Sequence, residues 1–121
     1  MAAKIDPPKI TPVKVALEGK CDTTFPMEKN DAGKIVQCNI AADLPVGPLV
    51  CLSGFVPVLH KDQTFRGCNQ KSPGTYGPIK CKNMVSFTQS GAMETCYLVE
   101  PYEGCSKHIE WDEKGNVTMC I

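Results

Sequence analysis

The sequence predicts a small, disulfide-rich, all-β domain built from four related hairpin units. Three observations lead to this fold class. Eight cysteines occur in 121 residues, an even number that suits a fully paired set of disulfides. Ten glycines and ten prolines interrupt the chain too often for long helices. The cysteines also recur at regular intervals, which indicates an internal pseudo-repeat.

The cysteine spacing divides the chain into four units. Consecutive cysteines lie 17, 13, 17, 13, 15, 9 and 15 positions apart, so long and short gaps alternate. An offset of thirty residues also brings Gly47-Pro48 onto Gly77-Pro78. The long gaps define the units 21–38, 51–68, 81–96 and 105–120. The bonded residues would be Cys21, Cys38, Cys51, Cys68, Cys81, Cys96, Cys105 and Cys120.

Each unit has the pattern of a β-hairpin. An apolar residue follows the first cysteine by four positions, and another precedes the second by three. The middles are polar and carry turn residues, as in Asp112–Gly115. We therefore expect a cysteine near the foot of each hairpin arm. The first apolar series is expected to face the core: Phe25, Phe55, Val85 and Ile109.

The remaining segments are an N-terminal arm and linkers. Residues 1–20 are predicted to be extended, with a possible strand at 13–17, and to precede a single domain over 21–121. The two longer linkers each contain a Gly-Pro dipeptide, which marks a turn.

Three symmetric disulfide pairings are compatible with the spacing. One closes each unit on itself. Another clips each linker and ties Cys21 to Cys120, and a third pairs alternate cysteines within 21–68 and 81–120. We favour the first. Structural zinc needs closely spaced cysteines, and none here are nearer than nine positions, so no metal site is expected.

Disulfides of this density predict a secreted, extracellular protein. Residues 1–8 lack the apolar core of a signal peptide, which suits either a mature secreted chain or a reduced intracellular one. The even cysteine count favours the first. The longest uncharged stretch, 44–59, is too short and proline-rich for a membrane span. Asn116 begins a glycosylation sequon, Asn-Val-Thr.

Charge is balanced overall but unevenly placed. Thirteen basic and thirteen acidic residues give no net charge, which disfavours nucleic acid as a partner. Residues 51–90 carry five basic residues against one acidic, whereas 91–121 carry two against six. These opposed regions either drive self-association or pack side by side and neutralise each other.

No catalytic motif is present, and no cofactor is expected. The chain lacks a nucleophile elbow, a phosphate-binding loop and a dinucleotide fingerprint. The alternative to a binding protein is a small secreted hydrolase, ribonuclease-like or glycosidase-like. It would use His60 or His108 with the C-terminal carboxylates Glu94, Glu100, Glu103, Glu110, Asp112 and Glu113.

About half of the chain resembles complement-control modules. The run from Cys38 to Cys68 has the spacing of the second half of such a module, and so does Cys96 to Cys120 with Trp111 between. The segments 21–38 and 81–96 are shorter than the first half of a module. More broadly, the chain looks like the small cysteine-rich proteins that fungi and parasites secrete against their hosts. No family is assigned.

The predicted function is therefore a non-enzymatic binding protein, a host-directed effector or toxin-like protein with a protein or glycan partner. The hairpin tips differ most between units, at 26–32, 57–62, 86–90 and 111–114. Two candidate binding surfaces follow: Phe55, Val56, Val58, His60 and Arg66 form one, and Tyr97, Tyr102 and Trp111 form the other. The apolar run 55–59 needs a cover, either residues 13–17, a second copy or a host protein.

Overall fold

The computed structural model describes residues 4–121, which form strands and turns but no helix. The all-β prediction is confirmed. Among these residues there is accordingly no helix of the length and apolar character that crossing a membrane requires. The strands are β1 (Glu28–Lys29), β2 (Ile35–Gln37), β3 (Leu44–Val46), β4 (Leu49–Cys51), β5 (Val58–Leu59), β6 (Phe65–Asn69), β7 (Gly74–Tyr76), β8 (Ile79–Phe87), β9 (Met93–Leu98), β10 (His108–Trp111) and β11 (Val117–Cys120).

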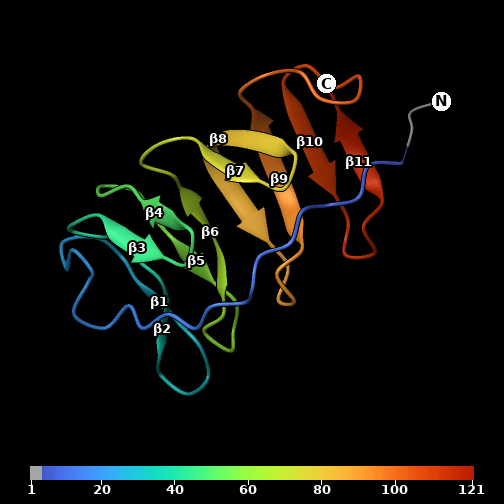
Figure 1. Ribbon diagram of the computed structural model, residues 1–121. Helices are drawn as coiled ribbons and strands as arrows, with labels where there is room; N and C mark the ends of the chain where they lie inside the picture. Colours follow the sequence, from blue (N-terminus) through green and yellow to red (C-terminus); the bar gives the residue numbers. More distant parts are fainter. Residues whose placement is uncertain (1–3) are drawn as a thin grey trace.

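Most strands join one antiparallel sheet whose spatial order follows the chain, β1-β2-β5-β6-β8-β9-β10-β11. Figure 1 shows this progression from β1 to β11. The link between β2 and β5 is a single residue pair, Gln37 with Val58. Strand β7 pairs with the first part of β8, while β3 and β4 form a separate two-stranded sheet.

Four disulfides each join the two ends of one cysteine-bounded segment, which is the pairing we favoured. They are Cys21–Cys38, Cys51–Cys68, Cys81–Cys96 and Cys105–Cys120. The turns that join the antiparallel pairs β1–β2, β5–β6, β8–β9 and β10–β11 lie within these four segments, while β6, β8 and β9 extend one or two residues beyond their cysteines. Bonds of this kind persist in oxidising compartments, so the structure indicates an oxidising environment.

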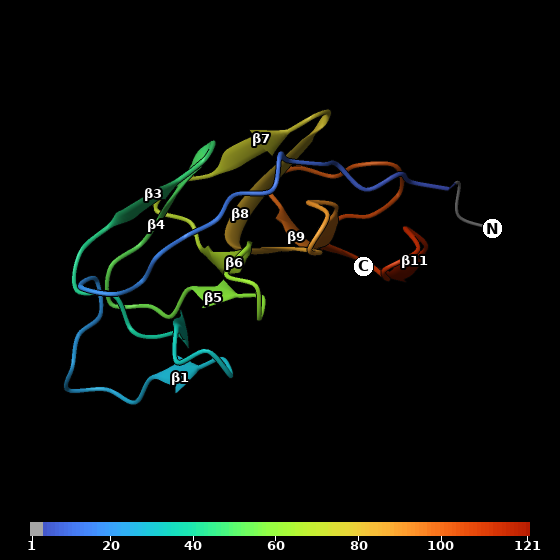
Figure 2. The same ribbon diagram turned by 90° about the horizontal axis from the view of Figure 1, so that it is seen from below.

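The two longer linkers are hairpins in their own right, which the sequence analysis did not predict. Strands β3 and β4 are joined by Gly47-Pro48, and β7 and β8 by Gly77-Pro78. Gly47 and Gly77 have φ of 51° and 57°, and proline fixes the following φ near −65°. That combination suits a type II′ turn, which matches the twist of the strands it connects. Both hairpins project from the same side of the main sheet (Figure 2).

The core lies between the main sheet and these two hairpins. Its aromatic centre is Phe87, whose ring centroid is 6.2 Å from that of Phe65 and 5.7 Å from that of Tyr76. Tyr76 comes from the second linker hairpin and Phe65 and Phe87 from the sheet, so this cluster fastens the two layers together.

The N-terminal segment is an extended strap that crosses the hairpin turns (Figure 1), and it contains no strand at 13–17. It makes only isolated bridges, Lys9 with Ala92 and Lys14 with Thr64. Near its start the Trp111 indole N–H donates to the Ile5 carbonyl at 2.8 Å. Leu17, at its other end, is fully buried. The Glu18 side chain also accepts from the Ile35 N–H at 2.7 Å, so the strap touches all four disulfide-closed segments.

The prediction that Phe25 and Phe55 belong to the core is wrong. They are 50% and 46% exposed, whereas Val85 and Ile109 are fully buried. The difference follows from local structure. Val85 and Ile109 lie in β8 and β10 and face inward, but Phe25 and Phe55 lie in bends ahead of β1 and β5.

Candidate functional site

The turns of the four disulfide-closed hairpins share one backbone conformation. In each, a residue's N–H donates to the carbonyl four positions later, and the N–H three positions later donates back to that residue's carbonyl. The residue three positions on has a positive φ in every turn, as in a type I turn followed by a left-handed bulge residue. That residue is Gly33, Gln63, Gly91 or Gly115. The side chains beside it are thereby fixed by a well-defined backbone.

A hollow of about 370 Å³ opens among three of these turns. Its volume is near the lower end of the roughly 300–1,000 Å³ typical of small-molecule sites. All the side chains around it are polar or charged: His60, Arg66, Thr88, Gln89, Ser90, Glu94 and Glu113. They come from the second, third and fourth hairpins. Three of the four predicted variable tips therefore meet at one place.

His60 is held in a defined orientation at the edge of this hollow. Its Nε2 lies 2.9 Å from the Phe87 carbonyl oxygen. Because a carbonyl only accepts, Nε2 carries the hydrogen and donates it. In the neutral ring Nδ1 then keeps a lone pair, so His60 offers an acceptor as well as a donor.

Arg66 and Glu94 form a loose ion pair across β6, β8 and β9. The Arg66 Nε and Glu94 Oε1 atoms are 3.6 Å apart, which is longer than a hydrogen bond. Glu94 Oε1 is buried and has no hydrogen-bond partner among the described residues. The arginine side chain is 51% exposed and that of Glu94 21%. Much of the guanidinium hydrogen-bonding capacity therefore faces outward.

Hydroxyl groups complete the wall. The Thr88 and Ser90 hydroxyl oxygens are 3.0 Å apart, so one donates to the other. The Ala92 N–H also donates to Thr88 Oγ1 at 3.2 Å. The neighbouring Asp62 has a pKa held well below its usual range, because the Thr64 hydroxyl and N–H and the Gln89 side chain donate to it. This contact connects the second and third turns.

A second hollow of about 410 Å³ adjoins the first beneath the strap. Ser90 and Glu113 belong to both hollows and form the ridge between them. The strap contributes Lys4, Asp6, Pro7 and Lys9, and the third and fourth turns contribute Ala92, Lys114 and Gly115. We call the two hollows together the turn groove.

The predicted binding residues divide between places. His60 and Arg66 line the turn groove. Phe55 and Val56 are exposed, and Val56 lines a separate hollow of about 180 Å³ with Phe25, while Val58 is half-buried. The strap's hydrogen bonds to the second hairpin go to Asp62, Gln63 and Phe65, beyond the apolar run. The structure therefore does not gather the first predicted surface into one site.

The second predicted surface is also divided. Trp111 is only 3% exposed and points to the strap, so it does not serve as the exposed anchor that we expected. Tyr102 is half-buried against the core. Tyr97 is 38% exposed and stacks on His108, with ring centroids 4.4 Å apart. Tyr97, stacked on His108, is the part of the second predicted surface that remains exposed.

The two histidines do not share a site. His60 is hydrogen-bonded to Phe87, and Phe87 pairs with Met93 at the end of β9 next to the turn. His108 pairs with Tyr97, farther along the same strand. Met93 and Tyr97 are four residues apart in one strand, or about 13 Å. His108 instead approaches Glu110, with Nε2 3.3 Å from Oε2. Within residues 4–121 no group of three His, Cys, Asp or Glu side chains is placed to hold a metal ion.

Sequence reasoning pointed to the hairpin tips but not to their convergence. Thr88, Gln89 and Ser90 lie in the predicted 86–90 tip, and Glu94 and Glu113 were among the C-terminal carboxylates. The strap residues Lys4 and Lys9 carried no signal in the sequence, because their role depends on contacts with distant turns. Comparisons of the chain with protein-family models, curated proteins and solved structures find no match. Structure and sequence together define the class, a small disulfide-rich β protein.

Proposed function

We propose that the protein is a secreted, non-enzymatic binding protein that contacts its partner through the turn groove. The supporting observation is the convergence of three turns on one polar hollow, each turn held by its own disulfide-closed hairpin. A rigid scaffold that presents variable turns suits recognition, because little conformational freedom is lost on binding. The partner is a protein or glycan outside the cell.

We further propose that the four hairpins are related units of one repeat. The common cysteine pairing, the two shared turn hydrogen bonds and the positive φ at the same position support this relation. Under this proposal the backbone is the constant part of each unit and the tip side chains are the variable part. The first unit, whose tip lies outside the turn groove, then serves mainly as structural support.

Binding is tested on arrays of extracellular proteins and glycans probed with the labelled protein. Arg66→Ala is expected to weaken capture at least tenfold, which corresponds to about 1.4 kcal/mol. Lys29→Ala is the matched control, because Lys29 is an exposed basic residue in β1, at the opposite edge of the sheet. Equal capture by both variants would remove the turn groove from the proposal.

A hydrolase is the second candidate, since the turn groove places His60 beside Glu94 and Glu113. A histidine with two carboxylates provides the acid and base that hydrolysis needs. Yeast RNA and p-nitrophenyl glycosides are the substrates to assay, with His60→Ala as the comparison. We expect no turnover. Turnover that disappears in His60→Ala would replace the binding proposal with the enzymatic one.

Asn116 is proposed to carry an N-linked glycan when the chain is made in a eukaryotic secretory pathway. It is exposed in the fourth turn, where only a long 3.5 Å contact joins its amide nitrogen to Asp112 Oδ2. Mass measurement before and after glycosidase treatment tests this, with Thr118→Ala as the variant that removes the sequon.

A further inference from the structure

The first hollow of the turn groove contains both hydrogen-bond donors and acceptors. Arg66 donates, Glu94 and Glu113 accept, and the Gln89 amide and the hydroxyls of Thr88 and Ser90 do both. His60 keeps an acceptor nitrogen because its other nitrogen donates to Phe87. Among the lining residues of the first hollow there is no aliphatic side chain and no Phe, Tyr or Trp. A ligand seated here must itself be rich in groups that both donate and accept.

The charges in the turn groove exclude strongly charged ligands. In the first hollow Arg66 faces Glu94 and Glu113. The second hollow adds Lys4, Lys9 and Lys114 against Asp6. Four basic groups therefore stand against three acidic ones, and both signs of charge line each hollow. A sulfated or phosphorylated chain would meet carboxylates, and a polycation would meet the guanidinium and ammonium groups.

We infer that the turn groove binds a neutral saccharide of at least two sugar units, an inference that rests on the proposed binding function. Sugar hydroxyls are neutral and each both donates and accepts. Of two adjacent hydroxyls, one accepts from the Arg66 guanidinium while the other donates to a carboxylate, so the ion pair with Glu94 need not separate. Such a ligand pairs with both the donor and the acceptor side chains of the turn groove and adds no charge to it.

The two hollows set the minimum length of this ligand. They adjoin along the ridge of Ser90 and Glu113, and they measure about 370 and 410 Å³. One sugar unit in each hollow would place the glycosidic linkage over the ridge. The strap residues Lys4 and Lys9 then contact the second unit. Disaccharides and longer chains are expected to bind more tightly than monosaccharides, because only they reach both hollows.

The test is a calorimetric titration of the intact, disulfide-bonded protein with four neutral trisaccharides: cellotriose, xylotriose, mannotriose and chitotriose. The matching monosaccharides are titrated in parallel. Arg66→Ala and Glu94→Gln are expected to weaken the best trisaccharide at least tenfold, and Lys29→Ala is expected to leave it unchanged. Unfolding midpoints of all variants check that the fold is retained. Products are analysed after each titration to detect cleavage of the linkage.

The outcomes separate this inference from the proposed function. Tighter binding of a trisaccharide than of its monosaccharide, lost in Arg66→Ala, supports both. Binding followed by cleavage supports the saccharide ligand but overturns the non-enzymatic function. If none of the four trisaccharides binds while the arrays still capture a protein partner through the turn groove, the saccharide is wrong and the binding function stands. Equal binding by wild type, Arg66→Ala and Glu94→Gln overturns the assignment of the site.

Discussion

The first and second disulfide-closed units, each taken with the linker hairpin that follows it, have the same backbone frame but different buried pairs. In both, the N–H of the residue after the opening cysteine donates to the carbonyl of the residue after the closing cysteine, Asp22 to Asn39 and Leu52 to Asn69. Isolated bridges also correspond, Cys21 with Ile40 and Cys51 with Gln70. The frame therefore does not depend on which side chains fill it.

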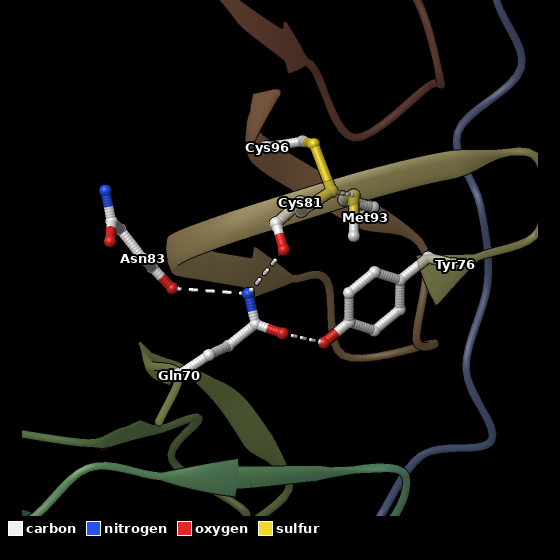
Figure 3. The surroundings of a disulfide bond; sticks show 6 residues. All are labelled: Gln70, Tyr76, Cys81, Asn83, Met93 and Cys96. Atoms are coloured by element: carbon white, nitrogen blue, oxygen red, sulfur yellow. Dashed lines mark hydrogen bonds between the residues drawn. A yellow bond between two sulfur atoms is a disulfide. The ribbon is translucent and has the colours of Figure 1, made fainter. Parts of the chain in front are cut away.

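The buried side chains of the two linker hairpins differ in chemistry. The first linker hairpin buries Ile40 and Val46, both apolar. At the corresponding positions, thirty residues later, the second buries Gln70 and Tyr76. The Tyr76 hydroxyl donates to Gln70 Oε1 at 2.5 Å, and Gln70 Nε2 donates to the carbonyls of Cys81 and Asn83 (Figure 3). Every polar atom of the two side chains finds a partner.

This contrast shows two ways to stabilise one hairpin. Apolar packing responds gradually, because removing one methylene group costs only its lost burial and the cavity it leaves, about 0.5–1.5 kcal/mol for Ile to Val. A buried polar pair is specific, because removing one partner leaves the other unsatisfied. The polar pair stands beside the Cys81–Cys96 disulfide (Figure 3), at β8, which pairs with β6, β7 and β9 and is the most connected strand. The hydrogen bonds from Gln70 to the Cys81 and Asn83 carbonyls hold the second linker to β8 at this point.

The largest expected difference between the two segments concerns their disulfides. Cys51 and Cys68 are at most 1% exposed, whereas Cys21, in the corresponding bond, is half-buried. Thiol exchange requires access to sulfur, so Cys21–Cys38 should be reduced faster than Cys51–Cys68, by on the order of tenfold. Partial reduction, alkylation and peptide mapping measure both rates in one sample. Equal rates would show that global unfolding limits reduction in both segments.

The next effect tests the polar pair directly. Gln70→Leu leaves the Tyr76 hydroxyl buried without a partner and is expected to cost about 1–3 kcal/mol of unfolding free energy. Gln70→Leu combined with Tyr76→Phe removes both polar groups and should recover part of that loss. Urea unfolding with the disulfides intact measures each variant.

Ile40→Val is the matched change in the first linker hairpin, expected to cost about 1 kcal/mol through the lost burial of one methylene group and the cavity it leaves. If the double variant at Gln70 and Tyr76 lost more unfolding free energy than the two single variants together, the two side chains would not stabilise the fold by satisfying each other's hydrogen bonds.

Local signals explain what could be predicted. Cysteine spacing and turn residues act over a few positions, so the hairpins at Asp112–Gly115 and its counterparts were visible in the sequence. The linker hairpins were not, because β3, β4 and β7 are each three residues long and β3 contains Pro45. The exposure of Phe25 and Phe55 depends on where each strand begins relative to its cysteine, and the pattern alone does not determine that.

The candidate site was predictable only as separate pieces. His60, Arg66 and the tips carried a signal, but their convergence requires the sheet order. The burial of Trp111 depends on a hydrogen bond to Ile5, 106 positions away, and no local pattern reports such a contact. A partly polar aromatic residue suits both a buried and an exposed site, so the sequence alone predicts an exposed anchor as readily as a buried side chain.

A smaller effect of the polar pair is its dependence on alkaline pH. Burial raises the pKa of Tyr76 to about 12 from its ordinary value near 10. Because the folded-state pKa is the higher one, this stabilisation is complete below pH 10 and is lost as the pH rises towards 12. Urea midpoints between pH 9 and about 12 should fall more steeply for wild type than for Tyr76→Phe. The first linker hairpin has Val46 at this position, which does not ionise, so it adds no pH dependence of this kind. Parallel curves would mean that Tyr76 ionises freely.

The smallest effect concerns the turns of the two corresponding units. Gln63 has a φ of 70° where the first unit has Gly33, with a φ of 78°. A side chain in this left-handed region is strained, so Gln63→Gly is expected to stabilise the protein by roughly 0.5–1 kcal/mol. The reciprocal change, Gly33→Gln, should destabilise it by a similar amount, because nothing lies within 4 Å of the added Cβ and only the backbone strain remains. Unfolding midpoints measure both changes. A loss of stability in Gln63→Gly would show that the Gln63 side chain makes contacts worth more than the strain it imposes, and that the second turn is not a strained copy of the first.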